Sequence, residues 1–141
     1  MTDVLIDTQF NELIATALAA RSNAYAPYSK FAVGAAVKCK SGAVFVGANV
    51  ENRSLGLTIC AERIAVAAAV AAGEREFVAI AVTSDSDEPI APCGACRQFL
   101  AEFNSDLTII SATVRGSRTI DNLSRLLPDP TRGLLRDANA S

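Results

Sequence analysis

Residues 60–73 read CAERIAVAAAVAAG and form the most regular segment of the chain. Alanine and other apolar residues fill every position after Arg63, and Gly73 follows the last of them. An alanine-rich run that ends at a glycine is typical of a buried helix with a glycine C-cap. Because nearly every side of this helix is apolar, we expect it to lie at the centre of the fold.

The segments on either side show alternating strand and helix patterns. Two β-rich runs, 31–39 and 43–49, are separated by Lys40, Ser41 and Gly42, which predicts a hairpin. Apolar periodicity predicts the remaining elements, which are helices over 9–20, 94–103 and 123–127 and strands over 77–83 and 107–114. Thr8 or Asp7 is the expected cap of the first helix.

Strand and helix alternate through the second half of the chain, which predicts right-handed crossovers and a mostly parallel sheet with helices on both faces. The length of 141 residues, half of them hydrophobic, is sufficient for one substantial core. We expect a single domain over residues 1–141, with an irregular tail from about residue 128 because Pro128 and Pro130 oppose helix.

Charge and composition exclude several classes of partner. Thirteen basic and fifteen acidic side chains give a net charge of -2. The chain therefore lacks the excess of basic residues that is typical of proteins that bind a nucleic-acid polymer or an acidic membrane surface. A small, nearly neutral partner is expected instead. The sequence indicates neither a signal peptide nor a membrane span, and we expect a cytoplasmic protein.

Three cysteines stand at the predicted starts of two helices. Cys60 opens one helix, and Cys93 and Cys96 open another. The chain has no histidine, so histidine catalysis is excluded and a metal site must use thiolates. The free N–H groups at a helix start lower the pKa of a thiol. Three protein ligands would leave a zinc ion with one position for water.

Charged residues beside these cysteines can complete a water-activating site. Glu62 is two residues from Cys60 and is close enough to exchange protons with a water on the metal. The net charge of three thiolates and zinc is about -1, which weakens the metal as a Lewis acid. Arg63 and Arg97 are candidates to offset this charge through a hydrogen bond to sulfur.

Two other roles of the cysteines remain open at this point. A structural zinc site normally closes its coordination with four protein ligands, and Cys39 would be the fourth. Cys93 and Cys96 could alternatively form a redox-active disulfide pair. The combination of Pro92, Cys-x-x-Cys and a distant Cys-x-Glu favours a third reading, because it matches the signature of zinc deaminases with cysteine in place of histidine.

Four motifs together resemble the small, homotetrameric cytidine deaminases that act on free nucleosides. They are YAPYSKFAVGAAV from residue 25, GANVEN from 47, GLTICAER from 56 and PCGACRQ from 92, and the resemblance spans roughly residues 10–130. It implies a three-layer α/β/α fold with a mixed five-stranded sheet. It also implies hydrolytic deamination of cytidine and 2′-deoxycytidine in pyrimidine salvage, with one Zn²⁺ per subunit.

The resemblance implies a role for each matching residue. Cys60, Cys93 and Cys96 would bind zinc, and Glu62 would shuttle the proton. The predicted substrate contacts are Phe31 on the pyrimidine ring, Asn49 and Glu51 on the ribose hydroxyls, and Ala61. Alternate residues of an extended segment point the same way, so Asn49 and Glu51 can face one sugar. Glu51 would repel a phosphate, which favours a nucleoside over a nucleotide.

The chain departs from the family pattern at two places. Arg53, Ser54 and Leu55 stand where members usually have Ala-Ser-Tyr, and Thr131 follows where a phenylalanine normally reaches into a neighbouring subunit. These changes leave two alternatives to cytidine deamination open. One is deamination of another aminopyrimidine nucleoside such as blasticidin S, and the other is a noncatalytic, zinc-stabilised module that binds a nucleoside.

Overall fold

The computed structural model describes the backbone of residues 2–134 and the side chains of residues 10–134. Its centre is one five-stranded sheet in the order β2-β1-β3-β4-β5. The strands are β1 (Val33–Cys39), β2 (Val44–Ala48), β3 (Phe77–Ser84), β4 (Thr108–Thr113) and β5 (Arg118–Asn122). The helices are α1 (Thr2–Ala20), α2 (Ala61–Ala71), α3 (Gly94–Ala101) and α4 (Leu123–Leu126), with 3-10 turns η1 (Arg21–Asn23) and η2 (Leu55–Leu57).

The sheet is mixed. β3 and β4 run parallel because α3 forms the crossover between them, whereas β1 pairs antiparallel with both β2 and β3, and β4 pairs antiparallel with β5. The expectation of a mostly parallel sheet was therefore wrong, whereas the mixed five-stranded sheet implied by the family resemblance is confirmed. The reason is that β1 lies between β2 and β3 and runs antiparallel to both, so α2 joins two parallel strands that are not neighbours. At the other edge β5 returns antiparallel to β4.

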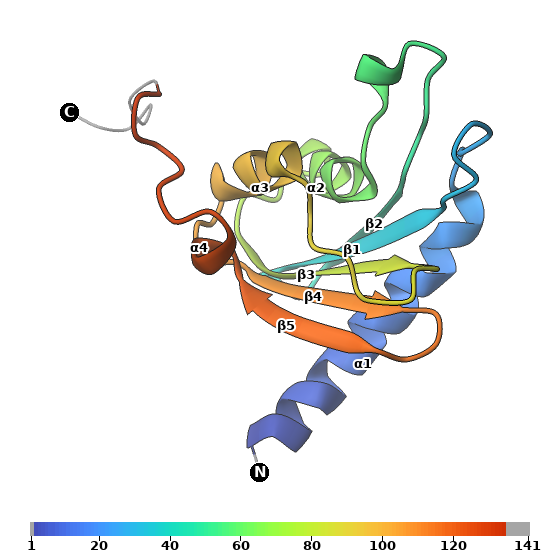
Figure 1. Ribbon diagram of the computed structural model, residues 1–141. Helices are drawn as coiled ribbons and strands as arrows, with labels where there is room; N and C mark the ends of the chain where they lie inside the picture. The colour runs from blue at the N-terminus through green and yellow to red at the C-terminus, as the bar shows by residue number, and fades with distance from the viewer. Residues whose placement is uncertain (1, 135–141) are drawn as a thin grey trace.

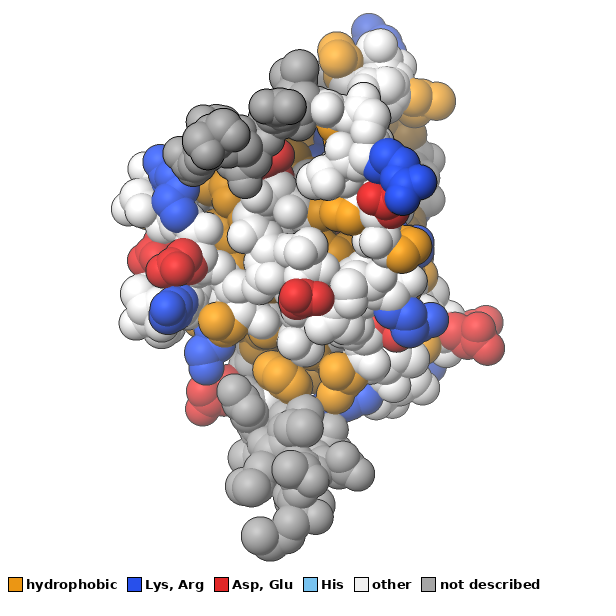
Figure 2. Space-filling model, turned by 90° about the vertical axis from the view of Figure 1, so that its left-hand side faces the viewer, with side chains coloured by type: hydrophobic (Ala, Val, Ile, Leu, Met, Phe, Trp, Pro, Cys, Tyr) orange, Lys and Arg blue, Asp and Glu red, His pale blue; other side chains and the backbone are white. Residues whose placement is uncertain are grey.

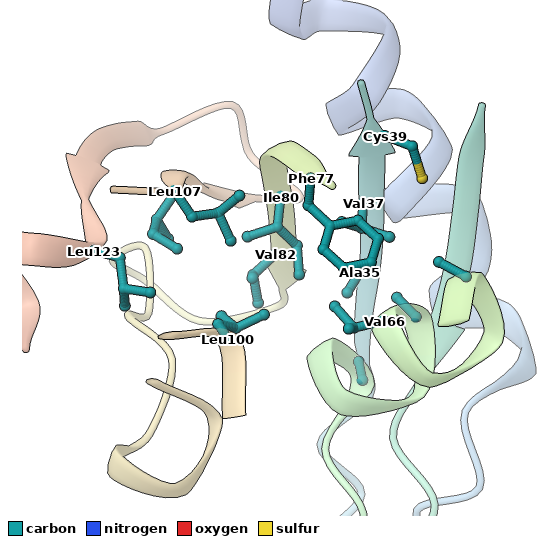
Figure 3. Close-up of a cluster of buried hydrophobic side chains, with 14 of the residues drawn as sticks. Ala35, Val37, Cys39, Val66, Phe77, Ile80, Val82, Leu100, Leu107 and Leu123 are labelled. Atoms are coloured by element: carbon teal, nitrogen blue, oxygen red, sulfur yellow. The ribbon is translucent and has the colours of Figure 1, made fainter. Parts of the chain in front are cut away.

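Helices cover both faces of the sheet, as predicted, and give three layers (Figure 1). α1 lies along one face, where Leu13, Ile14 and Ala17 pack against small residues of β1, β3 and β4. α2, α3 and α4 lie on the other face. The larger core is there, and Figure 3 shows Val37, Ile80 and Val82 of the sheet meeting Val66 of α2 and Leu100 of α3.

The alanine-rich segment forms α2 with the predicted ends. Cys60 is its N-cap residue, and the backbone N–H groups of Gly73 and Glu74 donate to the carbonyls of Val70 and Ala69 at its C-terminus. Gly73 has a φ of 99°, a left-handed conformation that glycine adopts without the cost of a Cβ. The helix is less central than its composition predicted, because Ala67 and Ala68 are exposed on its outer face.

The remaining elements agree with the predicted ones to within a few residues, with two differences. α1 begins at Thr2, so neither Asp7 nor Thr8 caps it. The fifth strand, β5, was not located from the sequence because RTIDN is polar and this edge strand is largely exposed. After α4 the chain has no regular element up to residue 134, as expected of the tail, and residues 135–141 lie outside the described part.

Two properties of the described residues bear on possible partners, the character of the helices and the distribution of surface charge. Within residues 2–134, no helix has both the length and the apolar character needed to cross a bilayer. On the face drawn in Figure 2, the described basic and acidic side chains are scattered singly among apolar and neutral ones. This face therefore carries charges of both signs and no patch of one sign.

Candidate metal and active site

The starts of α2 and α3 bring three cysteines together. The Sγ atoms of Cys60, Cys93 and Cys96 all lie within 4.8 Å of one another. Cys60 and Cys93 are the N-cap residues of the two helices, and both have extended backbones that turn their side chains toward the helix ends. Cys96 lies in the first turn of α3 and is fully buried, whereas Cys93 is exposed. The cluster therefore lies between the protein interior and solvent.

The three thiols fit a tetrahedral zinc ion. Zinc–sulfur bonds of 2.3 Å at tetrahedral angles place two sulfurs about 3.8 Å apart, and the Sγ atoms of Cys60 and Cys93 are 4.0 Å apart. Cys39 is the remaining cysteine, and its thiol is buried in the hydrophobic core at the end of β1 (Figure 3). Among the described residues, the cluster thus has three cysteines, which excludes the four-cysteine structural site.

Glu62 is the acidic residue of this site. It occupies the first turn of α2, two residues after Cys60, and only 4% of it is exposed. Burial raises the pKa of its carboxyl, and the nearby charge of Cys60 raises it further. A raised pKa lets a buried carboxyl hold a proton more readily than an ordinary one, which suits a proton shuttle.

Arg63 lies against the thiol cluster. Its Nη2 donates to Cys60 Sγ at 3.6 Å and to the Thr58 carbonyl at 3.4 Å. The pKa of Cys60 falls to about 5, because its sulfur accepts a hydrogen bond from Cys96 and a further one from Arg63. The pKa of the Cys96 thiol is raised by the same bond to Cys60 and by burial. Cys60 is thus the first of the two to become a thiolate.

Arg97 has a different position from Arg63. Its Nε donates to the Pro92 carbonyl at 2.7 Å, and its Nη1 donates to the Leu126 carbonyl at 3.0 Å. These bonds hold the peptide before Cys93 and tie the start of α3 to the end of α4. Of the two arginines predicted to offset the thiolate charge, Arg63 contacts sulfur, and Arg97 braces the backbone next to a thiol.

The predicted sugar-binding segment is joined to the thiol cluster through the backbone. Val50 pairs with Ile59, the residue before Cys60, through two N–H···O bonds of 2.9 Å. On its other side, Tyr25 donates to the Asn49 carbonyl and accepts from the Glu51 N–H. Sequence patterns missed this three-segment arrangement of 25, 49–51 and 59, because backbone pairing by single residues has no side-chain signature.

Asn49 and Glu51 both hold the loop that carries Phe31. Asn49 is buried, and its Oδ1 accepts from the Val33 N–H at 2.8 Å while its Nδ2 donates to the Phe31 carbonyl at 2.9 Å. Glu51 Oε1 accepts from the N–H groups of Tyr28 and Ser29. The pKa of Glu51 is lowered mainly by its hydrogen bond with Ser29.

Each of these side chains keeps capacity for a ligand. The Asn49 amide has a second N–H, and Glu51 has a second oxygen beyond those in the bonds above. The Phe31 ring is partly exposed, at 36%, and is therefore available for stacking. Ala61, in contrast, is fully buried as the first residue of α2, so neither its methyl group nor its backbone is exposed to a substrate.

The residues that depart from the family pattern lie on the outside of the molecule. Arg53 belongs to the exposed loop between β2 and α2, and Leu55 in the same loop is 74% exposed. Thr131 follows Pro130, whose carbonyl accepts from Gln98 Nε2 at 3.0 Å. Both places are therefore free to meet another molecule, and neither lies among the three thiols.

Comparison with known proteins agrees with this site. The family model described as "Cytidine and deoxycytidylate deaminase zinc-binding region" matches residues 7–112. A cytidine deaminase of Halalkalibacterium halodurans is 49% identical over 82% of this chain and 89% of its own length. One from Mycobacterium tuberculosis is 42% identical over 87% of this chain and 90% of its length.

Solved structures give the same result. The crystal structure of cytidine deaminase from Burkholderia pseudomallei superposes with a TM-score of 0.81 at 50% identity, and covers 84% of this chain and 95% of that one. That of Mycobacterium leprae superposes with a TM-score of 0.74 at 39% identity, over 85% of this chain and 98% of that one.

Proposed function

The chain belongs to the cytidine and deoxycytidylate deaminase family, and on that premise we propose that it hydrolyses cytidine and 2′-deoxycytidine to uridine and 2′-deoxyuridine. Water is consumed and ammonia is released. The observation that carries the proposal is a buried carboxylate, Glu62, in the same helical turn as one of three converging thiols. This pairing of a metal site with a proton carrier is what hydrolysis of an aromatic amine requires.

Cys60, Cys93 and Cys96 would hold one Zn²⁺ per subunit. Bound there, the metal lowers the pKa of water toward neutrality and so supplies the nucleophile. Arg63 offsets the negative charge of the thiolates by donating to Cys60 Sγ. Arg97 fixes the backbone before Cys93, which holds the two thiols of α3 in position.

Glu62 would make two proton transfers in sequence. It takes a proton from the attacking water and delivers it to N3 of the cytosine ring, which makes C4 electrophilic. It then carries the second proton of the water to the departing amino group, which leaves as ammonia. Burial of Glu62 supports this role, because a raised pKa lets one carboxyl act as base and acid at the same pH.

Phe31, Asn49, Glu51 and Ala61 would bind the substrate. The partly exposed Phe31 ring would stack on the pyrimidine, and the free N–H of Asn49 and the free oxygen of Glu51 would reach the ribose hydroxyls. The proposed contact of Ala61 with the base rests on the family resemblance alone, because Ala61 is fully buried in the first turn of α2. A carboxylate at the sugar end favours a nucleoside over a nucleotide.

Four further properties belong to the same proposal. We expect a homotetramer, because a largely apolar surface groove runs over α2 and α3, lined by Ile59, Ile64, Ala67, Ala68 and Phe99 together with Arg63. We expect a cytoplasmic enzyme, because all four cysteines are free and three form a thiol site that oxidation would destroy. Salvage of pyrimidine nucleosides is the pathway role that this reaction would serve. We also propose that residues 1–141 form one domain.

A panel of aminopyrimidine nucleosides tests the function. The purified, zinc-loaded protein should convert cytidine and 2′-deoxycytidine with a matching loss of absorbance and release of ammonia. Cytidine monophosphate and blasticidin S should react at least about 100-fold more slowly in kcat/KM. A protein that deaminates blasticidin S but not cytidine would reassign the substrate, and one that deaminates no member of the panel would refute the enzyme.

A further inference from the structure

Gly47 of β2 is pressed against the first turn of the helix that carries Glu62. A Cβ added at Gly47 would lie 2.4 Å from the Ala61 carbonyl oxygen and 2.5 Å from the Ala65 backbone nitrogen. Those two atoms are the partners of one i→i−4 hydrogen bond in an α-helix, and Glu62 follows Ala61 directly. The absence of a side chain at position 47 thus sets how closely this turn approaches the sheet.

Backbone conformation does not account for glycine at this position. Gly47 lacks the positive φ found at Gly42, Gly73, Gly116 and Gly133, so alanine can adopt its backbone geometry. Steric crowding by α2 is the reason that a side chain does not fit at position 47. Ordinary contact begins at 3.4 Å, so a Cβ at Gly47 would displace the start of α2 from the sheet by about 1 Å.

We propose that Gly47 is a positioning residue for the reaction: by letting the start of α2 rest on β2, it sets the distance between Glu62 and the three thiols. Cys60, the N-cap of the same turn, would move together with Glu62, whereas Cys93 and Cys96 are carried by α3 and would stay. The inference rests on the proposed function of Glu62 and adds the element that aligns it. A displacement of about 1 Å at a catalytic group can cost about 100-fold in rate.

Gly34 of β1 offers a matched control. A Cβ there would lie 2.1 Å from the Ala17 carbonyl oxygen and 2.8 Å from the Arg21 nitrogen, so it is as crowded as Gly47. Its neighbours belong to α1 and η1, on the face of the sheet opposite to α2. Substitution at Gly34 should therefore disturb packing without moving Glu62. Arg21 also holds the Ala32 carbonyl, so any effect on the substrate loop would fall on KM.

The test compares Gly47→Ala with Gly34→Ala in the full chain at 10 °C, with melting temperature, zinc content and the rate of zinc removal by a chelator measured for both. Cytidine turnover is expressed per bound zinc, so that unfolded protein does not enter kcat. For Gly47→Ala we expect kcat to fall about 100-fold, KM to change little, and zinc to leave faster. For Gly34→Ala we expect a similar loss of melting temperature with kcat within about threefold and unchanged zinc release.

Three results would overturn the inference. They are a folded Gly47→Ala protein with wild-type kcat and zinc release, an equal loss of kcat in both variants, and a Gly47→Ala protein that does not fold. Each would make Gly47 a packing residue only. If the unaltered protein proved inactive on cytidine, the proposed function would fail, but the difference in zinc release would still report on Gly47.

Discussion

Single residues in this site act through more than one contact, and Asn49 is the clearest case. Its side chain is bound on one edge by the backbone of Phe31 and Val33, and one N–H remains for a ligand. Asn49 is predicted to bind ribose, and it also fixes the loop that carries Phe31, the ring predicted to stack on the pyrimidine. Binding and preorganisation of the pocket thus depend on the same amide.

Asn49→Ala should lower stability and weaken substrate binding together. Loss of the amide leaves the buried Val33 N–H unpaired, which costs about 1–3 kcal/mol of unfolding free energy, and KM should rise more than kcat falls. Asn104→Ala is the control, because Asn104 also bonds two backbone groups, the Phe77 carbonyl and the Asp106 N–H. Denaturant melts should show a smaller loss of stability for Asn104→Ala, because its two bonds are part-buried and exposed. Steady-state kinetics should show an unchanged KM for this variant. A raised KM in both variants would refute the local role of Asn49.

At the level of elements, the site is made by two helix starts. Cys60 and Cys93 cap α2 and α3, and both helices pack on one face of the sheet, so the sheet fixes the separation of the thiols. These elements were predictable because CAERIAVAAAVAAG and PCGAC carry local signals of periodicity and capping. Strand β5 could not be predicted in this way, and neither could the pairing of Val50 with Ile59. Both are held by hydrogen bonds to neighbouring backbone and have no pattern of apolar side chains.

Arg63→Met should weaken zinc binding while leaving the fold intact. The guanidinium donates to Cys60 Sγ, so its removal leaves the thiolate charge uncompensated, and zinc affinity should fall about 10- to 100-fold. Arg75→Met is the control at the other end of α2, where the guanidinium donates to the Val70 and Glu74 carbonyls. Competition with a chromophoric chelator measures the zinc affinity of both variants. Equal affinity in the two variants would show that the charge of Arg63 has no effect on the metal.

At the scale of the whole molecule, the outer face of α2 is not covered by any other part of the described chain. Ala67 and Ala68 are exposed on α2, and with Ile64 and Phe99 they line an apolar groove. The composition of α2 correctly predicted a helix, but it could not distinguish burial within one subunit from burial between subunits. Likewise, the sequence indicated three thiol ligands, whereas the position of Cys39 in the core was needed to exclude a fourth.

Ala67→Arg should separate the proposed tetramer into smaller species. A guanidinium in the middle of the apolar groove would be buried without a partner on association, at a cost of several kcal/mol. Thr119→Arg adds the same charge on the exposed strand β5 and should leave assembly unchanged. Size-exclusion chromatography with light scattering gives the mass of each variant. A tetrameric Ala67→Arg protein would show that the contact between subunits does not involve this groove.

The central claim is that Glu62 carries the protons of a zinc-dependent deamination, and turnover of Glu62→Gln tests it most directly. Glutamine keeps the shape but cannot exchange a proton, so kcat on cytidine should fall by at least about 100-fold, with one zinc per chain retained. Glu76→Gln, at an exposed carboxylate beside Lys40, should keep wild-type turnover. Deamination at the wild-type rate by zinc-loaded Glu62→Gln would contradict the claim.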